Sequence, residues 1–148
     1  MRTYLVVMDD SPEARAALRY AARRAARTGG SVEIVTVIAP QEVVEWGGVQ
    51  AAMEEEARLR AEAMVLQASG AIAEEAGVRP TVTVRKGDPV SAVTELLGER
   101  EGVAALILGA AAEGGPGPLV AHFAGATAGT LPCPLVIVPE GLRLRADV

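Results

Sequence analysis

The stretch Tyr4-Leu5-Val6-Val7-Met8-Asp9-Asp10-Ser11-Pro12 decides the fold. Leu5 to Met8 are apolar without a break, which is typical of a parallel strand covered on both faces. Two acidic residues follow, and then Ser11 and Pro12 provide the N-cap and the first helical position with which many helices begin. The segment therefore predicts a buried strand that turns at once into a helix, the opening of a βαβ unit.

The same alternation of short β-branched runs and longer Ala-rich or charged stretches continues along the chain, as in a parallel α/β sheet. We expect five strands, at Tyr4–Met8, Val32–Ile38, Thr81–Val84, Val103–Leu108 and Leu135–Val138. The first, fourth and fifth runs are rich in uninterrupted apolar residues. We expect these three strands at the centre of the sheet or at an interface.

Four helices are expected between the strands. The first runs from Pro12 to Gly29-Gly30, and the second is long, from about Val49 to Ala76. The third begins at Asp88-Pro89, which repeats the cap-and-proline signal, and the fourth spans Leu119–Gly129. Right-handed crossovers then favour a doubly wound, five-stranded parallel sheet with four helices, in which the chain order reverses beside the first strand.

The composition of the chain excludes several classes of protein and of binding site. The 148 residues are 50% apolar and 22% charged, which indicates one soluble domain over residues 1–148. With a single cysteine and a single histidine, neither an internal disulfide nor a four-ligand zinc site is possible. The formal net charge of −5 has the wrong sign for a general nucleic-acid binder. Without a secretory signal or about 18 consecutive apolar residues, we expect a cytoplasmic protein with neither nucleic-acid nor membrane partners.

The reversal of strand order places the loop Asp9-Asp10-Ser11 opposite the loop Gly109–Pro118. Ligands of doubly wound sheets bind at this point. The second loop is rich in glycine, and its backbone amides are suited to hold phosphate. Neither loop carries a Walker A motif or a dinucleotide-binding fingerprint, so two large nucleotide-binding classes are excluded.

At this level the chain resembles the universal stress protein family, whose fold is Rossmann-like and similar to the adenine nucleotide alpha hydrolases. The resemblance rests on the Tyr4–Ser11 segment, on Gly87-Asp88-Pro89, on Leu106-Ile107-Leu108-Gly109 and on Leu131–Val138. It implies that Asp9 contacts a ribose, that Val37 lies against adenine and that Gly109 begins a phosphate motif. That motif reads Gly, two residues, Gly, nine residues, Gly and then Ser or Thr.

The phosphate motif departs from the family pattern after Gly109. Its second glycine position holds Ala112, and its final pair falls on Ala121-His122 or His122-Phe123. Gly114 and Gly115 remain as sources of backbone amides, and a shifted register from Gly115 to Gly125-Ala126 restores the nine-residue spacing. His122 stands where a hydroxyl contacts phosphate in the family.

These departures are expected to weaken ATP binding. A non-glycine residue in a left-handed conformation costs about 1 kcal/mol or more. Losing two charge-assisted hydrogen bonds removes about 3–6 kcal/mol, which takes a micromolar site to the millimolar range. In addition, no Lys or Arg occurs from Glu101 to Leu142, and Glu113 adds a negative charge to the loop.

Three other residues each allow more than one interpretation of their role. Asp10 is a possible partner of Asp9 around Mg²⁺, although acidic residues before a helix also stabilise its dipole. Cys133, between two prolines, is predicted to be an inert, at least half-buried thiol rather than a redox sensor. For Trp46 a lid over the pocket, a contact with a second subunit and simple packing all stay open.

Two functional hypotheses follow. In the first, the chain is a stress-response and regulatory domain with weak or lost ATP binding, acting through a homodimer and unidentified protein partners. In the second, it is an ATP or AMP sensor, with Mg²⁺ as a companion of ATP. Enzymatic turnover is not expected, because no nucleophile and base are paired in the sequence. Leu135–Val138, an apolar strand and the last one expected in the chain, is the expected dimer strand, as is common in the family.

Overall fold

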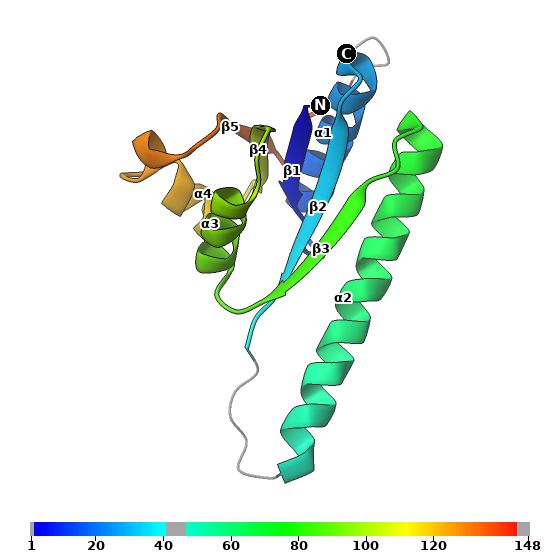
Figure 1. Cartoon of the computed structure of the whole chain (residues 1–148), viewed down its shortest axis with the longest axis vertical. Coiled ribbons are helices and arrows are strands. Elements are labelled where there is room, and N and C mark those ends of the chain that lie inside the picture. Colours follow the sequence, from blue (N-terminus) through cyan, green and yellow to red (C-terminus); the bar gives the residue numbers. More distant parts are fainter. Residues whose placement is uncertain (1, 41–46, 145–148) are drawn as a thin grey trace.

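The computed structural model describes residues 2–40 and 47–144, so Trp46 lies outside the described residues. Five strands form one parallel sheet: β1 (Thr3–Val7), β2 (Ser31–Ile38), β3 (Thr81–Lys86), β4 (Val103–Ala110) and β5 (Leu135–Pro139). Their spatial order is β3-β2-β1-β4-β5 (Figure 1). The predicted doubly wound sheet, with its reversal beside β1, is confirmed, and the strand boundaries differ by one or two residues.

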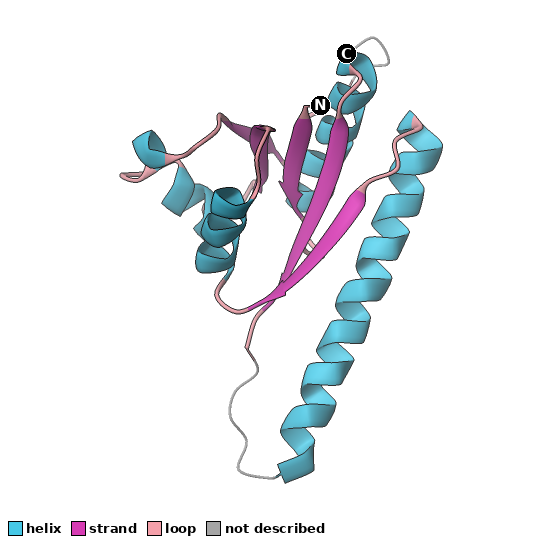
Figure 2. Ribbon diagram, viewed as in Figure 1, coloured by secondary structure: helices cyan, strands magenta, loops and turns pink. Residues whose placement is uncertain are grey.

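Side chains that alternate along the strands build a core on each face of the sheet. Tyr4, Val6 and Met8 face α1 (Pro12–Thr28) and α2 (Gly47–Ala76), whereas Leu5 and Val7 face α3 (Pro89–Glu99) and α4 (Pro118–Phe123). Two helices therefore cover each face, as Figure 2 shows. Because successive side chains of a strand point to opposite faces of the sheet, one apolar run such as β1 contributes to both cores.

The predicted helix signals are confirmed for α1 and α3. The Ser11 hydroxyl accepts a hydrogen bond from the Ala14 amide at 3.2 Å, and Gly29 ends α1 at a φ of 69°. Asp88 caps α3 by accepting from the Ser91 amide at 3.0 Å. The long helix α2 begins at Gly47, two residues before the predicted start, and Gly77 follows its end with a φ of 69°.

The predicted fourth helix, Leu119–Gly129, is wrong in extent. Helix α4 ends at Phe123, and a turn leads to a short 3-10 helix at Ala128–Thr130. The amide of Gly125 and the hydroxyl of Thr127 both donate to the carbonyl of His122, which closes the helix end. Beyond Phe123 the chain has only Ala, Gly and Thr until Leu131, so no large apolar side chain holds a longer helix to the sheet.

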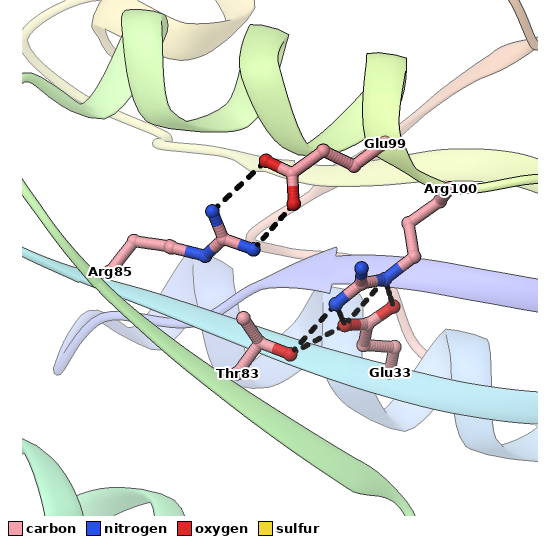
Figure 3. A network of polar contacts seen from close by, with 5 residues as sticks. All are labelled: Glu33, Thr83, Arg85, Glu99 and Arg100. Atoms are coloured by element: carbon pink, nitrogen blue, oxygen red, sulfur yellow. Dashed lines mark hydrogen bonds and ion pairs between the residues drawn. The ribbon is translucent and has the colours of Figure 1, made fainter.

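A polar network fixes α3 against β2 and β3 (Figure 3). Glu33, 5% exposed, accepts hydrogen bonds from Arg100 at 3.0 Å and from the Thr83 hydroxyl. Beside it, Arg85 donates twice to Glu99 at 3.0 Å. Burial alone would raise the pKa of Glu33, but the bonds from Arg100 and Thr83 outweigh burial and lower it.

No helix among the described residues is both long enough and apolar enough to cross a lipid bilayer.

Candidate functional site

Asp9 follows β1 after one residue, Met8, and is exposed at the carboxyl edge of the sheet. Its Oδ1 accepts hydrogen bonds from the Ser11 amide at 3.0 Å and from the Ser11 hydroxyl, so the side chain is held in a tight turn before α1. The neighbouring Asp10 pairs with Arg15 at 3.3 Å. Ser11 thus anchors one carboxylate oxygen of Asp9 at this edge of the sheet.

A groove of about 450 Å³ opens beside Asp9, between the carboxyl ends of β1 and β2 and one side of α2. We call it the α2 groove. Its lining residues are Asp9, Asp10, Thr36, Val37, Ile38, Ala39, Ala57, Arg60, Ala61, Met64 and Gln67. This volume lies within the range typical of small-molecule sites. The structure therefore brings Asp9 and Val37, two of the predicted site residues, to one groove.

The wall that α2 contributes to this groove was not predicted from the sequence. Ala57, Ala61 and Met64 recur at helical spacing along one side of α2, and the two alanines leave space that longer side chains would fill. Arg60 adds a guanidinium to the same wall. The helical spacing was visible in the sequence, but which side of α2 meets the end of β2 depends on tertiary packing.

The space between Asp9 and Gly109 is much smaller. A pocket of about 40 Å³, which we call the β1–β4 pocket, is lined by Asp9, Gly109 and residues of β1, β4, α1 and α4. This volume holds a few water molecules at most. Gly109 packs against the first turn of α1, where an added Cβ would lie 2.1 Å from the carbonyl oxygen of Glu13. Close backbone packing thus explains the glycine at position 109.

The glycine-rich loop after β4 places its left-handed residues later than the motif implies. Gly114, Gly115 and Gly117 have φ values of 77°, 87° and 99°, and no described non-glycine residue has a positive φ. Ala112 therefore does not adopt the left-handed conformation that enters the expected loss of ATP binding. The Ala112 amide instead donates to Glu140 Oε1 at 3.3 Å, a contact that the sequence did not indicate.

His122 and Phe123 line neither the α2 groove nor the β1–β4 pocket. Phe123 is 2% exposed and belongs to the core under α3 and α4. The half-buried His122 ring lies edge-on to Phe123, with the ring centres 4.9 Å apart. The Gly125 amide of the shifted register already donates to the His122 carbonyl at 3.3 Å. The geometry therefore assigns these residues to the end of α4.

The described residues do not form an evident magnesium site. They contain no group of three His, Cys, Asp or Glu side chains arranged to hold a metal ion. Asp9 is engaged by Ser11 and Asp10 by Arg15, so hydrogen-bond donors take one oxygen of each carboxylate. The two residues do not fit the paired, oxygen-rich arrangement that Mg²⁺ prefers.

Cys133 is half-buried against the core under α3 and α4. Burial raises the pKa of its thiol, which lowers the fraction of reactive thiolate at neutral pH. This environment agrees with the predicted inert thiol.

Comparison with known sequences gives one family match. The sequence model of the universal stress protein family matches residues 1–139. No curated protein sequence shows significant similarity to the chain. Among solved structures, the universal stress protein UspA from Lactobacillus plantarum superposes with a TM-score of 0.76 at 16% identity, over 93% of this chain and 97% of that chain.

Two further structural neighbours are described as nucleotide complexes. A universal stress protein from Archaeoglobus fulgidus in complex with dAMP has a TM-score of 0.64 and 17% identity, over 93% of this chain and 98% of that chain. A family protein from Arabidopsis thaliana with AMP bound has a TM-score of 0.60 and 15% identity, over 99% of this chain and 94% of that chain. At these identities the likeness establishes a common fold.

Proposed function

Because the chain belongs to the universal stress protein family, we propose that it is a regulatory domain that binds AMP or a related adenosine monophosphate and binds ATP only weakly. The α2 groove carries this proposal. It offers about 450 Å³ beside Asp9 and Val37, whereas the β1–β4 pocket toward the phosphate loop offers about 40 Å³. The site is thus open on the nucleoside side and nearly closed on the phosphate side.

The lining of the α2 groove suits a nucleoside. Val37, Ile38 and Met64 provide an apolar surface for a flat base, and Asp9 provides an acceptor for ribose hydroxyls. Arg60 supplies a cation for a single phosphate group from the opposite wall. Neighbours of the same fold were solved with AMP, dAMP and, in a third case, cAMP, each of which carries one phosphate.

The loop after β4 is poorly suited to a polyphosphate. From Glu101 to Leu142 the chain carries no Lys or Arg, and both Glu113, the next residue, and Glu140 add negative charge near Ala112. The Ala112 amide, at the second position of the family motif, already has an acceptor in Glu140. A triphosphate on this loop would therefore meet like charges with few free donors.

Regulation rather than turnover fits the arrangement of reactive groups. In the part of the chain that the structure describes, no hydroxyl or thiol is hydrogen-bonded to the ring of His122. The acidic groups beside the groove are engaged by Ser11 and Arg15. We therefore expect a bound nucleotide to be released unchanged.

We further propose that the chain acts as a homodimer through β5. This strand is one edge of the sheet and pairs only with β4 inside the protomer. Ile137 on β5 is 41% exposed, although it lies in an apolar strand. A second copy that pairs with or packs on β5 would cover both the open edge and this side chain.

The nucleotide proposal is tested by calorimetric titration of AMP into the wild-type protein and into Asp9→Asn. The side-chain amide oxygen that this substitution introduces still accepts from the Ser11 amide, but the free anionic oxygen is lost. We expect wild type to bind AMP and Asp9→Asn to bind about tenfold more weakly, the effect of one charge-assisted hydrogen bond.

Glu95→Gln is the matched control, since it removes the same charge from an exposed residue of α3 that does not line the α2 groove. We expect its AMP affinity to stay within about threefold of wild type. The proposal fails if wild type binds no AMP at millimolar concentration, or if the two variants lose affinity equally.

A further inference from the structure

We propose that Glu140 determines nucleotide specificity by occupying the phosphate loop with its own carboxylate, so that the site rejects pyrophosphate and triphosphate groups. This inference rests on the proposed function and deepens it, because it names the residue that favours a monophosphate. The observation behind it is the 3.3 Å hydrogen bond from the Ala112 amide to Glu140 Oε1.

The sheet fixes Glu140 in this position. Ala110 is in register with Pro139 at the end of the β4–β5 pair, and the Glu140 amide donates to the Ala110 carbonyl at 2.9 Å. The next turn is closed by the Leu142 amide, which donates to the Pro139 carbonyl at 3.0 Å. Glu140 is half-buried and directly follows Pro139, while Ala112 is the second residue after Ala110. The pairing of β4 with β5 therefore holds the Glu140 carboxylate beside the loop after β4.

A carboxylate and a phosphate compete for the same donors. Both present anionic oxygens to backbone amides, so the amide that donates to Glu140 cannot at once make a full bond to a phosphate oxygen. The loop also lacks a side-chain cation to balance two anions, because Glu101–Leu142 contains no Lys or Arg. A phosphate that enters must displace Glu140 or lie beside it.

The position of the contact explains why specificity, rather than all binding, is affected. Ala112 and Glu140 line neither the α2 groove nor the β1–β4 pocket. A ligand held by Val37, Asp9 and Arg60 therefore does not need the Ala112 amide. Only a ligand with a phosphate chain that extends along the loop after β4 meets the carboxylate of Glu140.

The test compares Glu140→Gln and Glu140→Ala with Glu113→Gln. The control removes the same charge from the loop after β4, at a residue for which the structure shows no hydrogen bond or ion pair to the described residues. Inorganic pyrophosphate, ATP and AMP are titrated into each protein by calorimetry, and the Ala112 amide is followed by ¹H–¹⁵N NMR. Thermal unfolding confirms that each variant is folded.

We expect Glu140→Ala, which frees the Ala112 amide, to bind pyrophosphate and ATP about tenfold more tightly than wild type. Glu140→Gln loses the charge but keeps an oxygen that can accept from Ala112, so we expect it to gain less than Glu140→Ala and more than Glu113→Gln. The AMP affinity of both Glu140 variants stays unchanged, and the Ala112 resonance shifts when pyrophosphate is added. Glu113→Gln gains less than about threefold.

Equal gains in Glu113→Gln and the Glu140 variants would overturn the inference, since only net charge would then matter. No gain in either Glu140 variant would also overturn it. Failure of the proposed function is a different result: wild type would not bind AMP, whatever the response to pyrophosphate. A gain in pyrophosphate binding without AMP binding would support the role of Glu140 and reject the adenosine groove.

Discussion

The end of β4 is pressed against the first turn of α1: a Cβ on Gly109 would lie 2.1 Å from the carbonyl oxygen of Glu13. Real Cβ atoms do not approach a backbone oxygen so closely. This contact joins β4 to α1 beside the reversal of the sheet, where the β1–β4 pocket measures only about 40 Å³. Gly109 thus serves the fold directly, and the same close packing limits room for phosphate.

Replacement of Gly109 by Ala is expected to lower the free energy of unfolding by about 1–3 kcal/mol, because the backbone of α1 or β4 must move. Gly98→Ala is the control. Gly98 lies in α3 with nothing within 4 Å of an added Cβ, so Ala there should stabilise the protein by about 0.5–1 kcal/mol. Urea unfolding measures both. Equal stabilities for the two variants would contradict the assignment of Gly109 to packing.

Glu33→Gln is expected to destabilise the fold by about 1–3 kcal/mol, because it leaves Arg100 without its anionic partner beside the sheet. Glu99→Gln is the comparison on the same network: Glu99 is paired with Arg85 at the surface, and we expect a smaller loss. Thermal or chemical unfolding at neutral pH measures the difference. A larger loss for Glu99→Gln would contradict the central place of Glu33.

The Glu33 contribution also has a defined pH dependence. Its pKa is lowered in the folded protein, so its stabilising effect is present above the ordinary glutamate pKa and is lost as pH falls through the lowered value. We expect the stability difference between wild type and Glu33→Gln to shrink in this acidic range. A difference that stays constant from neutral pH down to acid unfolding would show that the charge of Glu33 contributes nothing.

Arg60→Gln is expected to weaken AMP binding up to about fivefold and to leave adenosine binding unchanged, because an exposed cation on the groove wall contacts only the phosphate. Arg58→Gln is the matched control on α2, since Arg58 pairs with Glu55 at 2.7 Å and does not line the α2 groove. Titrations at low and high salt measure the effect. Equal losses for AMP and adenosine would place Arg60 against the base or ribose instead.

Ile137→Lys is expected to convert the proposed homodimer to a monomer, because a charged side chain on β5 opposes burial by a second copy. Val82→Lys provides the control on the opposite edge of the sheet, where Val82 is 43% exposed on β3. Light scattering after size-exclusion chromatography measures the mass of each. Dissociation by Val82→Lys alone would move the interface to β3, and a monomeric wild type would reject the dimer.

The sheet order was predictable because the signals for its elements are unambiguous. Continuous apolar runs indicate buried parallel strands, and Ser11-Pro12 and Asp88-Pro89 each indicate the start of a helix. The extent of the last helix was not. Leu119–Gly129 has good spacing for a helix, yet after Phe123 its small residues bury too little surface to hold one. The Thr127 hydroxyl donates to the His122 carbonyl and closes the helix there, which the apolar spacing of the sequence did not indicate.

The candidate site was predictable in part for a similar reason. Asp9 and Val37 follow or end strands, so topology alone places them at one edge of the sheet. The position of Arg60 at the groove depends on how α2 is rotated about its axis. The position of Glu140 beside the loop depends on the register of β5 against β4. Both are long-range relationships. The expected role of Ala112 changed for the same reason, because its backbone is unstrained but its amide is occupied.

The most direct test of the account is the ratio of AMP to ATP affinity in the wild-type protein, measured by calorimetry after any co-purified nucleotide has been removed. The open α2 groove and the occupied loop predict that AMP binds at least tenfold more tightly than ATP, a difference of about 1.4 kcal/mol. ATP binding as tight as AMP binding, or tighter, would show that the loop after β4 accepts a phosphate chain and would contradict the account.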